Sequence, residues 1–273
     1  MPTSTSTPSN PSENPGDSSG TLSEKPRTNY IQPQMTRLPA LTPWRRLFRG
    51  CLGRFARLIL SLLCRVDVKG LENFPAQGPA LIVFNHLGDA DVVVGLAYLP
   101  SCAIQALAKI DLYVEYPLIG WLMEAYGVIW VHRGVPDRRA LRAALDALQR
   151  GQFVAIAPEG RESLSGGLEE GTGGAAYLAL KSGAAILPVG VTGTANANVY
   201  GNLKRFRKPE ITLQVGKLFN LDENELNREA VQRGTEKIME KIAEQIPAEY
   251  RGAYKGSSFV QPTPPDSYTL HKF

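Results

Sequence analysis

The chain has 273 residues, a net charge of +4 and a hydrophobic share of 43%, values that suit a globular protein with a substantial core. Its three cysteines, Cys51, Cys64 and Cys102, are an odd set without metal-ligand spacing, which excludes a disulfide framework and a cysteine metal site. The first residues are polar and lack an apolar segment, so we expect no signal peptide.

Both ends of the chain are polar segments. Residues 1–36 are rich in Ser, Thr, Pro, Asn and Gly, so they cannot bury enough apolar surface to offset the entropy of ordering. We interpret them as a disordered tail. A transit peptide is a poor alternative, because Glu13, Asp17 and Glu24 are acidic. Residues 247–273 are rich in Pro, Ser and Tyr and are predicted to form a loose C-terminal tail.

Residues 37–65 contain a predicted amphipathic helix. One face of this helix carries Trp44, Leu47, Phe48, Cys51, Leu52, Phe55, Leu58, Ile59, Leu62 and Leu63, and the other carries Arg45, Arg46, Arg49, Arg54, Arg57 and Ser61. The apolar run from Leu58 to Cys64 is far short of the roughly 20 residues that span a bilayer. One interpretation is a core-packing helix with a solvated face. The absence of acids on the polar face favours another, a helix that lies in a membrane interface beside anionic head groups.

Residues 66–246 alternate between strand-like and helix-like patterns. Apolar runs with strand character lie at Ala80–Phe84, Ala103–Leu107, Val128–Val131, Phe153–Ala157, Ala185–Val191 and Ile211–Val215. Helical patterns lie at Asp137–Arg150, Gly174–Ser182 and Asp222–Gln245. This alternation predicts an α/β fold with a mainly parallel sheet flanked by helices.

The first cluster of reactive side chains follows the predicted strand Ala80–Phe84 and contains His86, Asp89 and Asp91. His86 lies just beyond the carboxyl end of that strand, where sites in parallel α/β sheets are usually found. A carboxylate from Asp91, or alternatively Asp89, would fix the tautomer of the ring and stabilise the imidazolium that forms when the ring takes a proton from a hydroxyl. The alternative is structural, with Asp91 capping the next helix and His86 a polar residue at a strand end.

A second cluster, His132 and Arg133, follows the predicted strand Val128–Val131. The guanidinium of Arg133 has the donor geometry to hold a phosphate, and a plain surface arginine fits the pattern equally well. His132 is predicted to have a structural role, because it directly continues the strand.

A third cluster, Glu159, Gly160 and Arg161, lies in a turn after a strand, which is a common arrangement for binding anions. Downstream, Gly171–Gly174 resembles a nucleotide-binding loop only superficially, since it lacks the Lys-Ser/Thr ending and the strand context. The fourth segment, Ile186–Val191, is an apolar strand that fits either a core position or one wall of an acyl-chain site.

Taken together, four motifs within residues 66–219 resemble those of the lysophospholipid acyltransferase family, in the family's order. The four are Asn85-His86 followed after four residues by Asp91, the stretch from Val128 to Arg133, Pro158-Glu159-Gly160, and Leu187-Pro188-Val189. Lys109 also stands where the family usually has a lysine between the first two motifs. An ordered set of motifs is far more specific than any one of them.

The resemblance implies an acyltransferase in which His86 is the general base and Asp91 orients it. The acceptor would be the free hydroxyl of lysophosphatidic acid in phospholipid synthesis, and the donor would be acyl-CoA or acyl-carrier protein, with no metal and no other cofactor. The implied acceptor-binding residues are Lys109, Arg133, Glu159, Gly160 and Arg161. The protein would be peripheral or monotopic on the cytoplasmic face of the cell membrane, with its two substrates and the membrane surface as partners and no nucleic acid.

Two departures from the family pattern concern the acceptor. The third motif usually reads Glu-Gly-Thr-Arg-Ser, whereas here Arg161 directly follows Gly160 and Glu162 takes the usual arginine place. The family also often has a lysine where this chain has Thr172. The acceptor could therefore instead be glycerol-3-phosphate, an ornithine-type lipid or another lysolipid. A further alternative is a noncatalytic lipid-binding adaptor that retains the fold. A serine hydrolase would need a Gly-x-Ser-x-Gly elbow between a strand and a helix, and residues 66–246 contain no such run.

Overall fold

The computed structural model describes residues 36–100, 104–132, 137–222 and 225–256. In these ranges the helices are α1 (Pro43–Leu63), α2 (Ala90–Tyr98), α3 (Asp111–Glu115), α4 (Pro117–Tyr126), α5 (Arg138–Gln149), α6 (Gly174–Ser182), α7 (Asn196–Lys204) and α8 (Arg228–Ala243), with 3-10 turns η2 (Leu71–Asn73), η4 (Ala248–Tyr250) and η5 (Gly252–Tyr254). The strands are β1 (Arg65–Lys69), β2 (Ala80–Phe84), β3 (Ile104–Lys109), β4 (Ile129–Val131), β5 (Phe153–Ile156), β6 (Ala185–Thr192) and β7 (Glu210–Val215). The predictions for residues 1–35, Cys102, Arg133 and residues 257–273 lie outside the described residues.

The strands form one sheet in the order β1-β7-β6-β2-β5-β3-β4 within the described residues. β6, β2, β5, β3 and β4 are mutually parallel, β7 runs antiparallel to β6, and β1 is parallel to β7. The prediction of an α/β fold with a mainly parallel sheet is confirmed. β1 was not among the predicted strands, because its short sequence alternates charged and apolar residues and its partner β7 is distant in the chain. The parallel strands bring the loops at their carboxyl ends to one edge.

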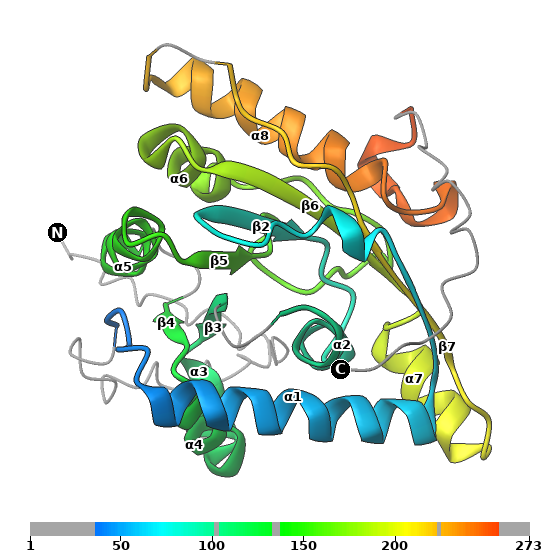
Figure 1. Cartoon of the computed structure of the whole chain (residues 1–273). Helices are drawn as coiled ribbons and strands as arrows, with labels where there is room; N and C mark the ends of the chain where they lie inside the picture. The colour runs from blue at the N-terminus through cyan, green and yellow to red at the C-terminus, as the bar shows by residue number, and fades with distance from the viewer. Residues whose placement is uncertain (1–35, 101–103, 133–136, 223–224, 257–273) are drawn as a thin grey trace, which may run out of the picture. The chain divides into compact units, whose positions relative to one another are not determined.

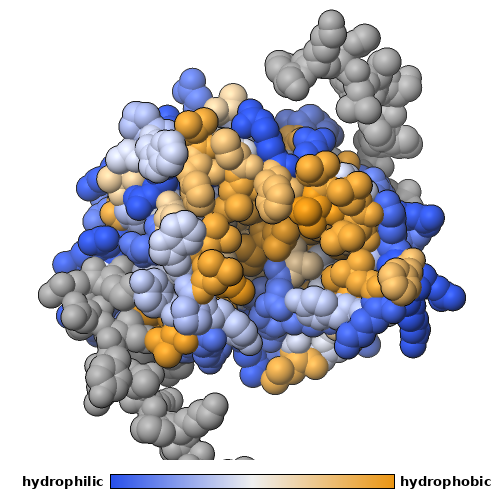
Figure 2. Space-filling model, turned by 90° about the horizontal axis from the view of Figure 1, so that it is seen from below, coloured by the Kyte–Doolittle hydropathy of each residue, from blue (hydrophilic) through white to orange (hydrophobic). Residues whose placement is uncertain are grey.

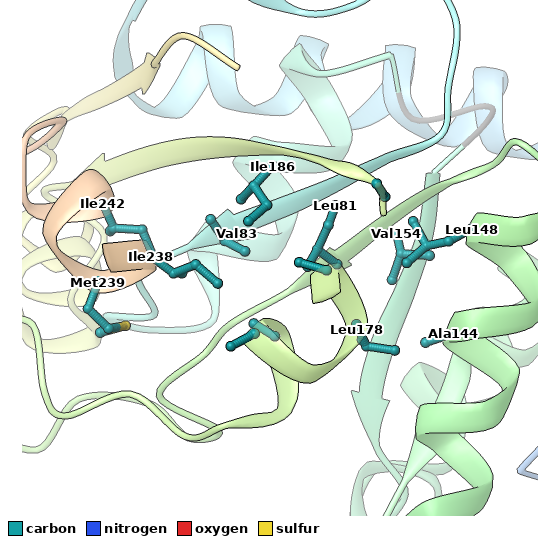
Figure 3. Close-up of a cluster of buried hydrophobic side chains, with 14 of the residues drawn as sticks. Leu81, Val83, Ala144, Leu148, Val154, Leu178, Ile186, Ile238, Met239 and Ile242 are labelled. Carbon is teal, nitrogen blue, oxygen red and sulfur yellow. The ribbon is translucent and has the colours of Figure 1, made fainter. Parts of the chain in front are cut away.

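Helices cover both faces of the sheet, α5, α6 and α8 on one and α1 and α2 on the other (Figure 1). Alternation along β2 supplies both cores, since successive side chains of a strand point to opposite faces. Leu81 and Val83 pack under α5, α6 and α8 (Figure 3), and Ala80 and Ile82 pack on the side of α1 and α2. A strand buried on both faces is expected in a parallel sheet, and it holds the β2 terminus rigidly where His86 follows.

Helix α1 faces the domain with small residues and a fully buried arginine, Arg49. The buried residues of α1 are Arg49, Gly53, Ala56 and Leu60. The guanidinium donates to the carbonyl oxygens of Tyr126 (2.8 Å), Ile104 (3.0 Å) and Gly127 (2.9 Å) and to Oε1 of Gln105 (3.0 Å). The placement of Arg49 on an outward-facing basic side is therefore wrong. A buried guanidinium is tolerated here because carbonyl and amide oxygens replace its water shell.

The apolar side of α1 points away from the domain. Its large exposed side chains include Trp44, Leu47, Phe55, Leu58 and Leu62, which are 55% to 73% exposed. Apolar side chains gather across the face of the molecule that carries α1 (Figure 2), and α4 adds Leu118 and Trp121, which are 78% and 61% exposed. Among the described helices we find none with the length and apolar content that crossing a bilayer requires.

The first residues of the predicted loose C-terminal tail are ordered against the domain. The N–H of Leu168 donates to the carbonyl of Tyr250 (2.7 Å), and the N–H of Ala253 donates to the carbonyl of Leu168 (3.1 Å). Arg251 is buried and its Nε donates to the carbonyl of Ile246 (3.0 Å). For residues 247–256 the prediction of a loose tail is wrong. That prediction rested on amino-acid composition, which does not reveal main-chain hydrogen bonds to a distant loop.

Replacing Arg49 by methionine should destabilise the fold. The substitution keeps an unbranched side chain and leaves the oxygens around it without donors, so we expect the free energy of unfolding to fall by about 3–5 kcal/mol. Chemical denaturation measures this value. Arg54→Met, at an exposed position of the same helix, is the matched control and should change stability by no more than about 0.5 kcal/mol. Equal effects of the two substitutions would contradict the buried placement.

Candidate active site

His86 and Asp91 meet at the carboxyl end of β2. His86 follows the strand by two residues, Asp91 is in the first turn of α2, and their side chains are 10% and 0% exposed. Asp91 Oδ2 accepts from His86 Nδ1 (2.9 Å) and from the backbone N–H groups of Leu87 (2.6 Å) and Gly88 (3.0 Å). The N-cap of α2 is Asp89, so the alternative in which Asp91 caps the helix is wrong. The contact expected from the spacing is present.

The contact fixes the tautomer of His86. An ionised carboxylate only accepts hydrogen bonds, so Nδ1 carries the proton and Nε2 keeps its lone pair. The same carboxylate would stabilise an imidazolium formed when Nε2 takes a proton. The second oxygen of Asp91, Oδ1, is buried without a hydrogen-bond partner among the described residues. The geometry is that of a general base prepared for a hydroxyl substrate.

The turn that carries His86 is fixed on two further sides. The Asn85 side chain bridges β2 and β6, because its Nδ2 donates to the carbonyl of Val191 (2.8 Å) and its Oδ1 accepts from the N–H of Val191 (2.7 Å). The N–H of Ser163 donates to the carbonyl of His86 (2.8 Å). Asn85 was predicted only as part of a motif. The contacts with Val191 and Ser163 were not predicted, because these two residues lie far from the His86 turn in the sequence.

Glu159 connects the His86 turn to the loop after β5. Its Oε1 accepts from the N–H of His86 (2.9 Å) and its Oε2 accepts from the N–H of Glu169 (2.8 Å). Burial raises the pKa of Glu159 to about 7, and the two backbone donors oppose that rise. Glu159 was predicted to bind the acceptor. Both of its oxygens are instead occupied by main-chain donors, so the structure gives it a positioning role.

Glycine and threonine shape the loop that contains Glu159. Gly160 has a φ of 72°, a left-handed conformation that glycine adopts without strain. Thr172, at the position where the family often has a lysine, closes the loop, because its N–H and its hydroxyl both donate to the carbonyl of Pro158 (2.8 Å each). Gly160 thus has a conformational role in this structure, and Thr172 supplies no cation to the site.

The predicted phosphate-binding cations are paired with nearby acids. Lys109 Nζ lies 3.3 Å from Asp111 and 3.7 Å from Glu115. Arg161 forms a two-pronged contact with Glu169, at 2.8 and 3.0 Å, and it lines an open pocket of about 650 Å³ that His86 and Asp91 do not line. The structure therefore does not bring Lys109 or Arg161 to His86. Arg133 lies outside the described residues.

Glu162, and not Arg161, faces His86. Its Oε1 lies 3.9 Å from His86 Nε2, and its side chain is 41% exposed. The second histidine of the domain, His132, is held by Asp137 in a similar way, with Nδ1 3.0 Å from Oδ2. Asp137 also caps α5, which agrees with the structural role predicted for His132. Within the described residues no group of three or more His, Cys, Asp or Glu side chains is arranged to hold a metal.

The central part of the chain is similar to known acyltransferases. Residues 65–192 match the family model named Acyltransferase. A chloroplastic 1-acyl-sn-glycerol-3-phosphate acyltransferase of Arabidopsis thaliana is 31% identical over 156 residues, which are 56% of this chain and 43% of that protein. A lyso-ornithine lipid O-acyltransferase of Pseudomonas aeruginosa is 35% identical over 160 residues, 57% of this chain and 58% of that protein. The chain thus spans about half the length of these relatives.

A solved structure shares the fold. The crystal structure of the 1-acyl-sn-glycerophosphate acyltransferase of Thermotoga maritima superposes with a TM-score of 0.56 and 23% sequence identity, covering 71% of this chain and 77% of that one. At this identity the likeness supports the arrangement of sheet and helices alone.

Glu159 should make stability depend on pH. Its pKa in the folded protein, about 7, lies above the ordinary value of 4.5, so between these values the folded state binds more protons and its stability falls as pH rises. Each pH unit between the two pKa values is worth about 1.4 kcal/mol, so the loss is of the order of 3 kcal/mol by pH 8. Denaturant titrations at pH 5 and pH 8 measure it.

Glu159→Gln is the control for this measurement, because the amide does not titrate. The stability difference between the wild type and this variant should shrink or change sign as pH rises from 5 to 8, in favour of the variant. A difference that is constant across this range would contradict the raised pKa of Glu159.

Proposed function

We propose that the protein transfers a fatty acyl group from a thioester donor to the free hydroxyl of a lysolipid. The match of residues 65–192 to the Acyltransferase family model supports this proposal. The observation that carries the proposal is the His86–Asp91 pair, in which Nδ1 is held at 2.9 Å and Nε2 keeps its lone pair. A noncatalytic adaptor would have no use for this arrangement.

The pair supplies the proton transfers of the reaction. The acceptor oxygen attacks the thioester carbonyl while His86 Nε2 takes the hydroxyl proton, and a tetrahedral intermediate forms. When the carbon–sulfur bond breaks, the imidazolium returns the proton to the leaving thiolate. Asp91 keeps the ring in place and stabilises its charged form. Such a base contributes roughly 10²–10⁴-fold in rate, and backbone N–H groups are sufficient to stabilise an oxyanion.

The proposed donor is acyl-CoA or acyl-carrier protein, since both present a fatty acyl thioester. Two acceptors have support from relatives. Lysophosphatidic acid is the acceptor implied by the family resemblance of the four motifs and by the name of the Arabidopsis protein. A lyso-ornithine lipid is implied by the name of the Pseudomonas protein, and Glu162, in the place where the family usually has arginine, favours it. The two acceptors offer a hydroxyl to the same base and differ in the charge of the head group.

We further propose that the exposed apolar side of α1 rests in the membrane interface, on the cytoplasmic face. The outward Trp44, Leu58 and Leu62 provide the aromatic and aliphatic anchors of an interfacial helix. Exposed Arg46 and Arg54 on the same helix would pair with anionic head groups. Because α1 also contributes buried Arg49, this membrane surface is part of the folded domain.

Removing two of the anchors should weaken membrane binding without unfolding the protein. The double variant Leu58→Ser, Leu62→Ser should bind phosphatidylcholine vesicles containing phosphatidylglycerol at least about tenfold more weakly. Vesicle co-sedimentation measures the binding. The control is Leu218→Ser, Leu226→Ser, which changes two leucines exposed elsewhere. If both double variants bind as the wild type does, the α1 surface is not the membrane contact.

The transfer reaction itself is tested by His86→Ala. Protein purified in mild detergent is given labelled acyl-CoA or acyl-carrier protein with lysophosphatidic acid or lyso-ornithine lipid, and product is followed with time. Turnover should fall by about 10²–10⁴-fold. His132→Ala, which removes the other aspartate-bound imidazole of the domain, should retain turnover. Near-wild-type transfer by His86→Ala would contradict the assignment of the base.

A further inference from the structure

The loop after β5 places a carboxylate beside the reactive nitrogen of His86. Glu162 Oε1 lies 3.9 Å from His86 Nε2. The next residue, Ser163, donates its N–H to the carbonyl of His86 (2.8 Å), so the backbone that carries Glu162 is anchored to the histidine itself. A separation of 3.9 Å is longer than a hydrogen bond. Nε2 therefore stays open to an acceptor hydroxyl, and Glu162 supplies negative charge next to it.

The charge of Glu162 is not neutralised by the cations of the loops around it. Of the described residues, His86 is the one basic group within ion-pair distance of the Glu162 carboxylate. Lys109 and Arg161 are each bound to their own acids. Asp89, in the His86 turn, is a second carboxylate nearby and accepts a hydrogen bond from the hydroxyl of Tyr200 (3.2 Å).

Tyr200 lies beside the same group of carboxylates. The pKa of Tyr200 is raised, first by burial and next by the negative charge of Asp89, with a further contribution from Glu162. A phosphate monoester brought to His86 would carry nearly two negative charges next to these carboxylates. It would meet repulsion from Glu162 where the family's usual arginine would attract it.

We propose that Glu162 determines acceptor specificity and selects lysolipids whose head group carries a protonated amine. The inference rests on the proposed acyl transfer and names its acceptor class. The amine of the bound acceptor pairs with Glu162, and the acceptor hydroxyl lies at Nε2 of His86. Because Glu162 is partly exposed, the pair is worth a factor of roughly two to five in kcat/KM for an amine-bearing acceptor over one without an amine.

The test compares two acceptors that carry an amine, lyso-ornithine lipid and lysophosphatidylethanolamine, with two that do not, lysophosphatidylglycerol and lysophosphatidic acid. Lysophosphatidylethanolamine and lysophosphatidylglycerol are both phosphodiesters, so their comparison isolates the amine from the phosphate charge. All four are presented in the same mixed micelles with the same acyl donor, and kcat/KM is measured for each. The acceptor with the highest kcat/KM should carry an amine.

Glu162→Gln and Glu162→Arg then assign the preference to this side chain. Glu162→Gln should lower kcat/KM for the best amine acceptor by roughly two- to fivefold and leave the amine-free acceptors unchanged or improved. Glu162→Arg should favour lysophosphatidic acid. Glu170→Gln, the same charge change at an exposed position of the same loop, is the matched control and should keep the wild-type ranking. Thermal unfolding checks that all variants fold.

Two results would overturn the proposal while leaving the proposed function standing. One is a best acceptor without an amine, and the other is an equal effect of Glu162→Gln on acceptors with and without an amine. Transfer to none of the four acceptors by the wild type, with either thioester donor, would contradict the proposed function itself and this inference with it.

Discussion

One carboxylate oxygen, Oδ2 of Asp91, accepts three N–H groups from the turn that carries His86. Two of these donors are main-chain groups, so the carboxylate sets the path of the backbone as well as the orientation of the ring. Since the side chain of Asp91 is fully buried, its hydrogen bonds are not weakened by competing water. The tautomer of His86, the open lone pair on Nε2 and the proposed proton transfers all follow from this contact.

The surrounding fold keeps that turn rigid. The β2 strand is packed on both faces, Asn85 ties its end to β6, and Glu159 joins it to the loop after β5. The same loop carries Glu162 to the open side of the ring. His86 and Glu162 are thus held by one network of hydrogen bonds at the carboxyl ends of the parallel strands.

The fold class was predicted from the sequence pattern, and the His86–Asp91 pair was predicted by the family resemblance among alternatives that local spacing left open. Periodic apolar runs predict strands and helices, and five residues from a strand end to a helix start bring the two side chains within reach. β1 was missed because an edge strand of five residues with alternating charges carries little apolar signal, and its partner β7 is more than a hundred residues away.

Three basic residues have contacts that were not predicted from the sequence. A helical wheel placed Arg49 on an outward side, and the family resemblance implied substrate-binding roles for Lys109 and Arg161. Their actual directions are set by partners that a pattern does not reveal, namely the carbonyls around Arg49, the acids beside Lys109 and Glu169 beside Arg161. A helical wheel likewise shows which residues of α1 share a face, and it cannot show which face packs on the domain.

Turnover of the variant Asp91→Asn is the most direct measurement of the central claim. The amide oxygen can take over the three hydrogen bonds of Oδ2, and the amide nitrogen would occupy the position of Oδ1, which has no partner among the described residues. The substitution thus removes the negative charge while retaining the contacts of the turn. We predict that kcat falls by roughly 10²–10⁴-fold while the variant stays folded. Turnover within twofold of the wild type would contradict the account of His86 and Asp91 as the reacting pair.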